Sequence, residues 1–508
     1  MNFWNRIFVR QENAKDAVAL IAGSVYPLAF APFDFSAAMF ISLGALFFIW
    51  MESAPNRAAF RGLLFGLGMF GFSSVWAFNS LYSHAGISLV LSVGIFSFLV
   101  LILAACVAVV GWLQARFHTN NDCFQLLLLI PSFWLLAEFA RTYLFTGFPL
   151  LLAGYSQVDT ALVNYAPYLG VHGVSLLVTV CSGLLALMVR HTKSRKPAFA
   201  GMVSIFLVGV VAGLPSWTEP TDKKFSAALI PGVLPSIYKW NYKYREEILN
   251  HFWQTSRQYK EVDLIIWPEL SLPVAYNRLS DDYRKNLLSF IEATNTNLVF
   301  GAAESVSDQT RGKYYNSAIT LGSGKSVYHK QHMIPFLEYY PFSGGHRFFS
   351  KYFNIPMSSF IHGNRNQPLA DIKGVLTSIN ICYEDAFPFQ FHRNTRNAEM
   401  VINLSEDGWF ENTTKVPQRI QISRMRAIES GRPVLRVANN GESALINYDG
   451  TVVASNRENY KKPLEVTVVP RIGETPYMRF GLLPVIVILI ASLLVCALPW
   501  ANRLRNRD

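Results

Sequence analysis

Charged residues are scarce in this chain: they make up 16% of its 508 residues, whereas apolar residues make up 51%. The scarcity is concentrated in residues 17–215 and 480–500, while residues 217–479 have the composition of a water-soluble domain. Apolar runs of about 20 residues, the length that a helix needs to cross a bilayer, recur in the charge-poor parts. The sequence therefore argues against a wholly soluble protein. It predicts about eight membrane spans, near residues 17–33, 36–51, 63–83, 86–114, 123–141, 166–189, 198–215 and 480–500.

Lysine and arginine are missing from every second loop between these spans. The short loops near residues 34–35, 84–85 and 142–165 carry none, whereas the other loops and both tails are basic. An even number of spans puts both termini on one side, and the positive-inside rule makes that side the cytoplasm. The net charge of +11 is thus mainly a signal of topology, and no nucleic-acid partner is expected.

The predicted organisation is seven spans, a domain outside the cytoplasm, and a last span with its tail, at residues 1–216, 217–479 and 480–508. Cysteine is rare, and of five in the chain only Cys382 falls in the domain outside the cytoplasm. That domain therefore cannot form an internal disulfide. A lone cysteine in an oxidising compartment is either buried and inert or a working nucleophile, and taken alone it is more often a core residue.

Sequence repeats and low-complexity tracts are also absent, and residues 217–479 alternate short β-like runs with amphipathic segments. This alternation predicts an α/β domain in which helices cover the strands. Strands are expected at 227–230, 264–267, 298–302, 317–321, 375–382, 400–404, 434–438 and 444–448, and helices at 244–259, 281–293 and 418–429. Residues 336–364 form a long irregular stretch with nine Phe or Tyr residues, a richness that argues for a functional loop and against disorder.

Three residues that could act together in catalysis stand at or just past the ends of predicted strands: Glu269, Lys330 and Cys382. Each alone is more often structural, as a solvated turn residue, a surface charge or a core cysteine. Together they make chemical sense, because a thiol with an ordinary pKa of about 8.5 needs a base or a cation to become a nucleophile. Glu269 could accept the thiol proton, and Lys330 could stabilise the thiolate and then the oxyanion of a tetrahedral intermediate.

These residues stand in motifs that resemble the Glu-Lys-Cys triad of the nitrilase superfamily, namely Trp267-Pro268-Glu269, Lys330 and Cys382-Tyr383-Glu384. Over nearly its whole length the chain is similar to the membrane-embedded branch of that superfamily, the apolipoprotein N-acyltransferases. Further motifs carry the likeness: Glu138-Phe139-Ala140-Arg141, Leu144 to Pro149, Lys239-Trp240, His332 to Pro341, Arg424-Met425-Arg426-Ala427 and Asn439-Asn440-Gly441. The resemblance implies a membrane α-helical bundle with an α/β nitrilase-like domain, a four-layer α-β-β-α sandwich, inserted before the last span.

The resemblance also implies a ping-pong acyl transfer at a bacterial inner membrane. A phospholipid would give its sn-1 acyl chain to Cys382 as a thioester, and the N-terminal amine of a diacylglyceryl-cysteine apolipoprotein would then take it. Glu269 would be the general base and Lys330 the oxyanion stabiliser. The domain carrying them would be periplasmic, with both termini cytoplasmic. No metal and no other cofactor is implied, and a monomer is expected.

Other residues are expected to support this site. Glu338 matches a supporting acid of the family, and Glu384 is expected to support Cys382 from its place two residues further on. The aromatic loop 336–364 could form the lipid entry, although a loop packed on its own domain fits its composition equally well. Substrate-binding side chains are expected at Trp240, Tyr383 and Trp409.

The sequence departs from the family at three places. Leu337 stands where a glycine is usual, Glu406-Asp407-Gly408-Trp409-Phe410-Glu411 replaces Asn-Asp-Ala-Trp-Phe-Gly, and Pro231-Gly232-Val233 replaces Gln-Gly-Asn. These departures leave open the acyl donor and acceptor, including a diverged paralogue with a different acceptor. Two other interpretations stay open: a membrane-tethered nitrilase-like amidase that hydrolyses its acyl-enzyme with water, and a non-enzymatic lipoprotein-binding or scaffold protein.

Overall fold

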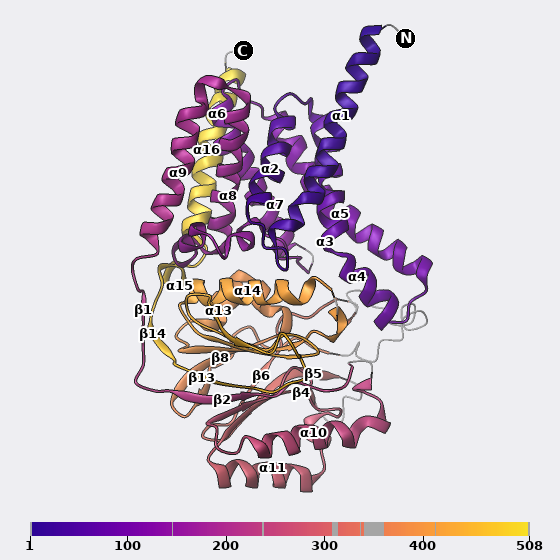
Figure 1. The fold of residues 1–508 in the computed structure, drawn as a ribbon, viewed down its shortest axis with the longest axis vertical. Helices are drawn as coiled ribbons and strands as arrows, with labels where there is room; N and C mark the ends of the chain where they lie inside the picture. The colour runs from indigo at the N-terminus through magenta and orange to yellow at the C-terminus, as the bar shows by residue number, and fades with distance from the viewer. Residues whose placement is uncertain are drawn as a thin grey trace. The chain divides into compact units, whose positions relative to one another are not determined.

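The chain folds into two compact units in a computed structural model that describes residues 3–144, 146–235, 238–306, 313–335, 337–339, 360–411 and 413–505 (Figure 1). The helical unit comprises Met1–Phe78, Ser88–Pro215 and Phe480–Asp508, and the sheet-containing unit comprises Asn79–Ile87 and Ser216–Arg479. Most of the aromatic loop expected at 336–364 lies outside the described residues.

Eight long helices build most of the helical unit. They are α1 (Phe3–Val25), α2 (Ala37–Trp50), α3 (Pro55–Ser73), α5 (Leu89–Arg116), α7 (Ile130–Tyr143), α8 (Ala166–Arg190), α9 (Arg195–Ala212) and α16 (Leu483–Arg505). Their apolar composition explains why they form in this unit, since a helix satisfies its own backbone hydrogen bonds without water.

The number of spans that the structure supports is smaller than the eight expected. Four helical segments of the described residues are long and apolar enough to cross a membrane: Leu89–Arg116, Asp122–Tyr143, Ala161–Arg190 and Thr192–Ala212. A fifth arises if Pro55–Ser73 and Val75–His84, which meet at a bend of 54°, count as one span. Ala37–Trp50 and Leu483–Ala497 are apolar but shorter. The sequence therefore predicted the apolar helices correctly but did not establish how many cross a bilayer.

Glycines allow α3 and α5 to pack backbone against backbone. A Cβ atom at Gly62 would lie 2.5 Å from the carbonyl oxygen of Val107, and one at Gly66 would lie 2.5 Å from Cα of Ala104. Such small residues are the usual means by which membrane helices approach closely, because lipid supplies no hydrophobic drive for their association.

The motif at residues 138–141 fastens the segment that follows α7. Glu138 Oε1 accepts hydrogen bonds from the Trp134 indole, at 3.2 Å, and from the backbone amide of Ala153, at 2.8 Å. Arg141 donates to the backbone carbonyls of Leu150 and Leu151. These two charged residues therefore satisfy buried backbone groups of an irregular segment.

Two six-stranded sheets form the centre of the sheet-containing unit. The first has the order β13-β2-β3-β4-β5-β6 and the second the order β12-β11-β10-β9-β8-β7. Parallel pairing joins β2, β3 and β4 in the first sheet and β8, β9 and β10 in the second. The strands are β2 (Phe225–Leu229), β3 (Leu264–Ile266), β4 (Asn297–Ser305), β5 (Tyr314–Leu321), β6 (Ser326–His329), β7 (Ala370–Ile372), β8 (Val375–Ile381), β9 (Met400–Glu406), β10 (Val434–Asn439), β11 (Ala444–Ile446), β12 (Val452–Ser455) and β13 (Leu464–Val468).

Helices cover the outer face of each sheet, which confirms the four-layer α-β-β-α sandwich (Figure 1). Helices α10 (Arg245–Gln258) and α11 (Asp281–Thr294) pack on the first sheet. Helices α13 (Pro388–Thr395) and α14 (Lys415–Ser430) pack on the second. The inner faces of both sheets share one apolar core. Strands such as β3 are buried on both faces, which explains why their residues are apolar.

A short ribbon closes the sheet-containing unit where the chain enters and leaves it. Strands β1 (Thr218–Pro220) and β14 (Arg471–Gly473) pair antiparallel. The Arg471 guanidinium donates to the hydroxyl and the carbonyl of Thr218. The two ends of the unit are thus fixed side by side.

Candidate active site

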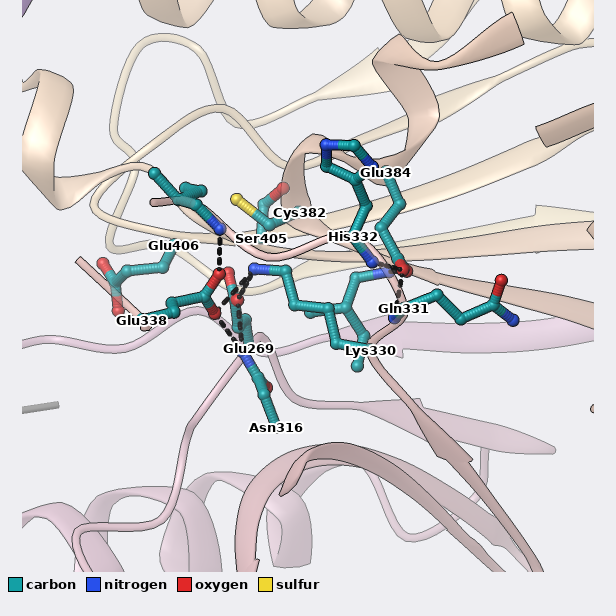
Figure 2. A network of polar contacts seen from close by, with 12 residues as sticks. Glu269, Asn316, Lys330, Gln331, His332, Glu338, Cys382, Glu384, Ser405 and Glu406 are labelled. Carbon is teal, nitrogen blue, oxygen red and sulfur yellow. Dashed lines mark hydrogen bonds and ion pairs between the residues drawn. The ribbon is translucent and has the colours of Figure 1, made fainter. Parts of the chain in front are cut away.

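The three residues expected to act in catalysis meet at the ends of strands in both sheets (Figure 2). Glu269 follows β3, Lys330 follows β6 and Cys382 follows β8. All three side chains are buried. The structure therefore brings together residues that are up to 113 positions apart in the sequence, counted from 269 to 382.

A close backbone contact sets the position of Glu269. The amide of Gly301, in β4, donates to the carbonyl of Pro268 at 3.1 Å. A Cβ atom at residue 301 would lie 2.6 Å from that oxygen and from Cα of Glu269. Only glycine fits there, so the turn that presents the carboxylate is held against the neighbouring strand.

Lys330 lies between two carboxylates. Its Nζ donates to Oε1 of Glu269 and to Oε1 of Glu338, each at 2.9 Å (Figure 2). The expected supporting acid, Glu338, is therefore in direct contact with the lysine. Its second oxygen accepts from the backbone amide of Ile334 at 2.8 Å, which fixes the carboxylate in place.

Asn316 completes this cluster, and sequence reasoning missed it. From β5 its Nδ2 donates to Oε1 of Glu269 at 2.8 Å and to Oε1 of Glu338 at 2.9 Å. The same two oxygens thus receive hydrogen bonds from both Asn316 and Lys330. The strand predicted at 317–321 began one residue after Asn316, so no feature of the sequence indicated that its amide enters the site.

If Cys382 is acylated as the sequence predicts, Asn316→Leu should slow that acylation about tenfold or more. The change removes two charge-assisted hydrogen bonds, each worth about 1.5–3 kcal/mol. The Asn316 hydrogen bond helps to lower the pKa of Glu269, so its loss should raise that pKa and favour the protonated carboxyl, which cannot act as a base. The measurement is the single-turnover rate of thioester formation. As a control, Asn297→Leu removes another buried strand asparagine, whose oxygen accepts from Ser323 at 2.8 Å. An equal loss in both variants would show that general destabilisation is responsible.

Cys382 begins a sharp turn where β8 ends, one residue earlier than the sequence indicated. Its φ of 53° is in the left-handed region that residues with a Cβ rarely adopt. The residue opens a short 3-10 turn, Cys382–Ala386, and its thiol lies above the Glu269–Lys330 pair (Figure 2). Strained backbone of this kind concentrates at functional sites, where the surrounding structure holds it.

The electrostatics favour a neutral thiol beside an ion pair in the resting state. Burial raises the pKa of Cys382 to about 12, and the Glu269 carboxylate adds to this, while Lys330 opposes it. Burial alone would raise the pKa of Glu269, but Lys330 and the hydrogen bonds from Asn316 and Cys382 outweigh it, so this pKa is lowered. Burial would lower the pKa of Lys330, yet the two glutamates raise it well above its usual value.

Glu384 ties the strand of Lys330 to the turn of Cys382. Its carboxylate accepts from the backbone amides of Gln331, His332 and Ile381 at 2.7, 3.1 and 2.8 Å. The Tyr328 hydroxyl and the Gln390 amide also donate to it. Burial raises the pKa of Glu384 even though the backbone donors oppose this shift. The predicted support is thus a link between the two halves of the site.

The residues expected to bind substrate have different surroundings. Trp240 packs against a small apolar cluster that includes Leu270, directly after Glu269. Tyr383 packs edge-on against Phe387, with ring centroids 4.8 Å apart. Trp409 instead contacts the segment Asn79–Ile87, where the Ser80 hydroxyl donates to its backbone carbonyl at 2.6 Å. None of these contacts by itself assigns a substrate.

Two of the departures from the family pattern have local explanations. The carboxylate of Glu406 accepts from Lys239 and, at 2.9 Å, from Asn439, so its added charge is matched. The backbone amide of Gly232 donates to the Oδ1 atom of Asn439 at 3.0 Å, which holds the Pro231-Gly232-Val233 segment in place.

Comparison with known proteins identifies the family of this chain. A family model described as apolipoprotein N-acyltransferase N-terminal domain matches residues 22–184, and one described as carbon-nitrogen hydrolase matches residues 236–477. The sheet-containing unit therefore defines an enzyme of the carbon-nitrogen hydrolase class. The chain is 32% identical over 481 residues to the apolipoprotein N-acyltransferase of Coxiella burnetii, covering 94% of this chain and 99% of that protein. The chain belongs to the apolipoprotein N-acyltransferase family and is an acyltransferase of lipoprotein maturation.

Two further similarities complete the comparison. The apolipoprotein N-acyltransferase of Methylococcus capsulatus is 31% identical over 490 residues, which is 96% of each chain. The crystal structure of a carbon-nitrogen hydrolase from Helicobacter pylori G27 is 18% identical, with a TM-score of 0.35 over 48% of this chain and 88% of that one.

Proposed function

We propose that Cys382, Glu269 and Lys330 carry out the acyl transfer of this family, with Cys382 as nucleophile, Glu269 as general base and Lys330 as oxyanion stabiliser. The observation that supports the proposal is the buried ammonium of Lys330, which is hydrogen-bonded to the carboxylates of Glu269 and Glu338 and lies beside the thiol. Such a group stabilises developing negative charge more strongly than it would in water.

In the first half-reaction the thiol proton passes to Glu269 as the sulfur attacks the sn-1 ester carbonyl of a phospholipid. A carbon–sulfur bond forms, and Lys330 stabilises the oxyanion of the tetrahedral intermediate. The ester carbon–oxygen bond then breaks, and the proton on Glu269 passes to the departing lysophospholipid oxygen. Because the resting thiol has a raised pKa and Glu269 a lowered one, proton transfer has to accompany the attack.

In the second half-reaction the N-terminal amine of a diacylglyceryl-cysteine apolipoprotein attacks the thioester. A carbon–nitrogen bond forms, the carbon–sulfur bond breaks, and Glu269 relays the amine proton to the Cys382 sulfur. The burial of Cys382, which is 4% exposed, supports transfer to an amine over hydrolysis because it limits access of water.

The same proposal includes the membrane arrangement. The eight long helices would be the spans, with residues 1–216, 217–479 and 480–508 as the three domains. The basic loops and tails support cytoplasmic termini and a periplasmic catalytic domain in the inner membrane, and we propose a monomer. Such an arrangement suits lipid substrates, because moving an acyl chain into water costs about 0.8 kcal/mol for each methylene.

The test is to incubate the purified protein with a phospholipid labelled in its sn-1 chain and to map the label by mass spectrometry. We expect a thioester on Cys382 that persists without an amine and is transferred to an added lipopeptide with a free diacylglyceryl-cysteine amine. Absence of label on Cys382 would refute the nucleophile. Rapid release of free fatty acid without an amine would instead favour the hydrolase, and a stable label excludes a purely scaffolding role.

A further inference from the structure

One face of α14 carries polar side chains toward the turn of Cys382. Lys415, Arg419 and Ser423 are four residues apart and therefore lie on the same side of the helix. All three are buried. Burying an arginine beneath a sheet is costly unless it is paired, so its contacts indicate what it does.

Arg419 contacts both the nucleophile and an acid of the same turn. Its Nη2 donates to the backbone carbonyl of Cys382 at 2.6 Å, and its Nη1 lies 2.8 Å from Oδ1 of Asp385. The Ser423 hydroxyl holds the other oxygen of Asp385 at 2.9 Å. The guanidinium is thus paired with Asp385 through one nitrogen and hydrogen-bonded to the Cys382 carbonyl through the other.

A second donor already satisfies the same carbonyl. Asn403, in β9, donates to it at 3.0 Å. Asn403 and Arg419 together therefore use both lone pairs of this carbonyl oxygen. Two donors on one oxygen restrain the peptide of Cys382, whose φ of 53° needs such restraint.

We propose that Arg419, anchored by Asp385, is a positioning residue for acyl transfer that holds the Cys382 turn so that its thiol faces Glu269 and Lys330. This inference rests on the proposed role of Cys382 as nucleophile. Arg419 reaches the turn from the helix layer outside the second sheet, whereas Lys330 reaches the thiol from the first sheet. The nucleophile is thereby held between two cations that belong to different layers.

The charges around the thiol agree with this placement. Arg419 and Lys330 both lower the pKa of Cys382, against the larger effects of burial and of Glu269. The charged groups that surround the turn are Glu269, Lys330, Glu338, Glu384, Asp385, Asp407, Lys415 and Arg419. Loss of Arg419 removes a cation from this set, so the thiolate should become harder to form.

The test compares two buried ion pairs of α14 by matched double substitution. Arg419→Met with Asp385→Leu removes the pair at the turn, and Arg426→Met with Glu429→Leu removes a buried pair of 2.7 Å on the same helix. Replacing both partners avoids leaving one charge buried alone. Each variant is measured for thermal midpoint, single-turnover acylation of Cys382 by labelled phospholipid, and the rate of Cys382 alkylation between pH 7 and 10.

We expect the first double variant to acylate about tenfold more slowly at each pH, because the Cys382 turn loses the guanidinium that restrains it. Its alkylation rate should change less, because the double change removes one cation and one anion together. The control variant, Arg426→Met with Glu429→Leu, should acylate and alkylate at wild-type rates once the rates are corrected for the fraction of folded protein. An acylation rate within about twofold of wild type in the first variant, or an equal loss of acylation in both variants, would overturn the proposal.

A single change covers the case in which the first double variant does not fold. Arg419→Lys keeps the charge opposite Asp385 but cannot hold two partners in the fixed geometry of a guanidinium. It should alkylate at nearly the wild-type rate yet acylate more slowly, and a wild-type acylation rate would refute the positioning role. If Cys382 in the wild-type protein takes up no label, the proposed role of Cys382 as nucleophile is wrong. That result differs from a wild-type acylation rate in the variants, which would refute only the positioning role of Arg419.

Discussion

Replacing Cys382 with serine is expected to slow N-acylation by at least about 10⁴-fold, the scale of loss when a catalytic nucleophile is removed. A serine hydroxyl is a far weaker acid than a thiol, and Glu269 is a weak base because its pKa is lowered. The carboxylate therefore cannot activate the hydroxyl. The measurements are acyl-enzyme formation with labelled phospholipid and complementation of a strain that depends on this activity.

The matched control is a second buried cysteine away from the site. Cys181 is fully buried in α8, so Cys181→Ser makes the same chemical change in a protected setting. Its N-acylation rate should stay near that of the wild type. Full complementation by Cys382→Ser would exclude the proposed nucleophile and favour a scaffolding role.

Lys330→Met is expected to lower the acylation rate by about 10³-fold or more, since one oxyanion donor alone contributes about 10²–10³. It also breaks a buried network, which typically costs about 3–5 kcal/mol of stability. Glu269 and Glu338 would then face each other with Asn316 as their shared donor, and one of them should take up a proton. Both effects follow from removing one ammonium group.

The pH dependence of stability should reverse in this variant. In the wild type the pKa of Glu269 lies below its ordinary value of 4.5, so its contacts stabilise the fold above that pH and are lost as pH falls through the folded pKa. In Lys330→Met the folded pKa is raised, so the contribution is complete below the unfolded value and is lost as pH rises. The thermal midpoint of Lys330→Met, measured between pH 4 and 8, should therefore decrease as the pH is raised toward 7.

A surface lysine provides the control for this experiment. Lys373 pairs with Asp263 at 2.7 Å and is partly exposed, so Lys373→Met should change stability by no more than about 1 kcal/mol. Its acylation rate should be unchanged. A wild-type rate of thioester formation in Lys330→Met would exclude the assigned role of the lysine.

Residues that end strands were the part of the site that could be predicted from sequence. Glu269, Lys330 and Cys382 follow strands, and the ends of strands are where side chains converge in a sandwich of this kind. Asn316 and Arg419 were not predicted as site residues. Each lies inside an element, where only the three-dimensional pairing of strands and helices shows which face it presents.

The limits of the fold prediction have similar physical causes. The strands β3, β4, β8 and β9 were predicted because they are largely buried and each contains a run rich in apolar residues. The strands β6, β7, β12 and β13 were missed because they are short and partly exposed, which weakens any period-2 pattern. The number of spans could not be determined from hydropathy, because hydropathy does not separate a crossing helix from a shorter apolar one.

The ribbon of β1 and β14 has a consequence for when the sheet-containing unit can finish folding during synthesis. Strand β2 obtains its neighbour β13 only after residues 464–468 have been synthesised, and β1 obtains β14 only after residues 471–473. The first sheet therefore has an open edge at β2 during most of translation. Completion of the catalytic fold is coupled to arrival of the last stretch before α16, so a chain that stops short of residue 464 would keep its triad residues yet lack a closed scaffold around them.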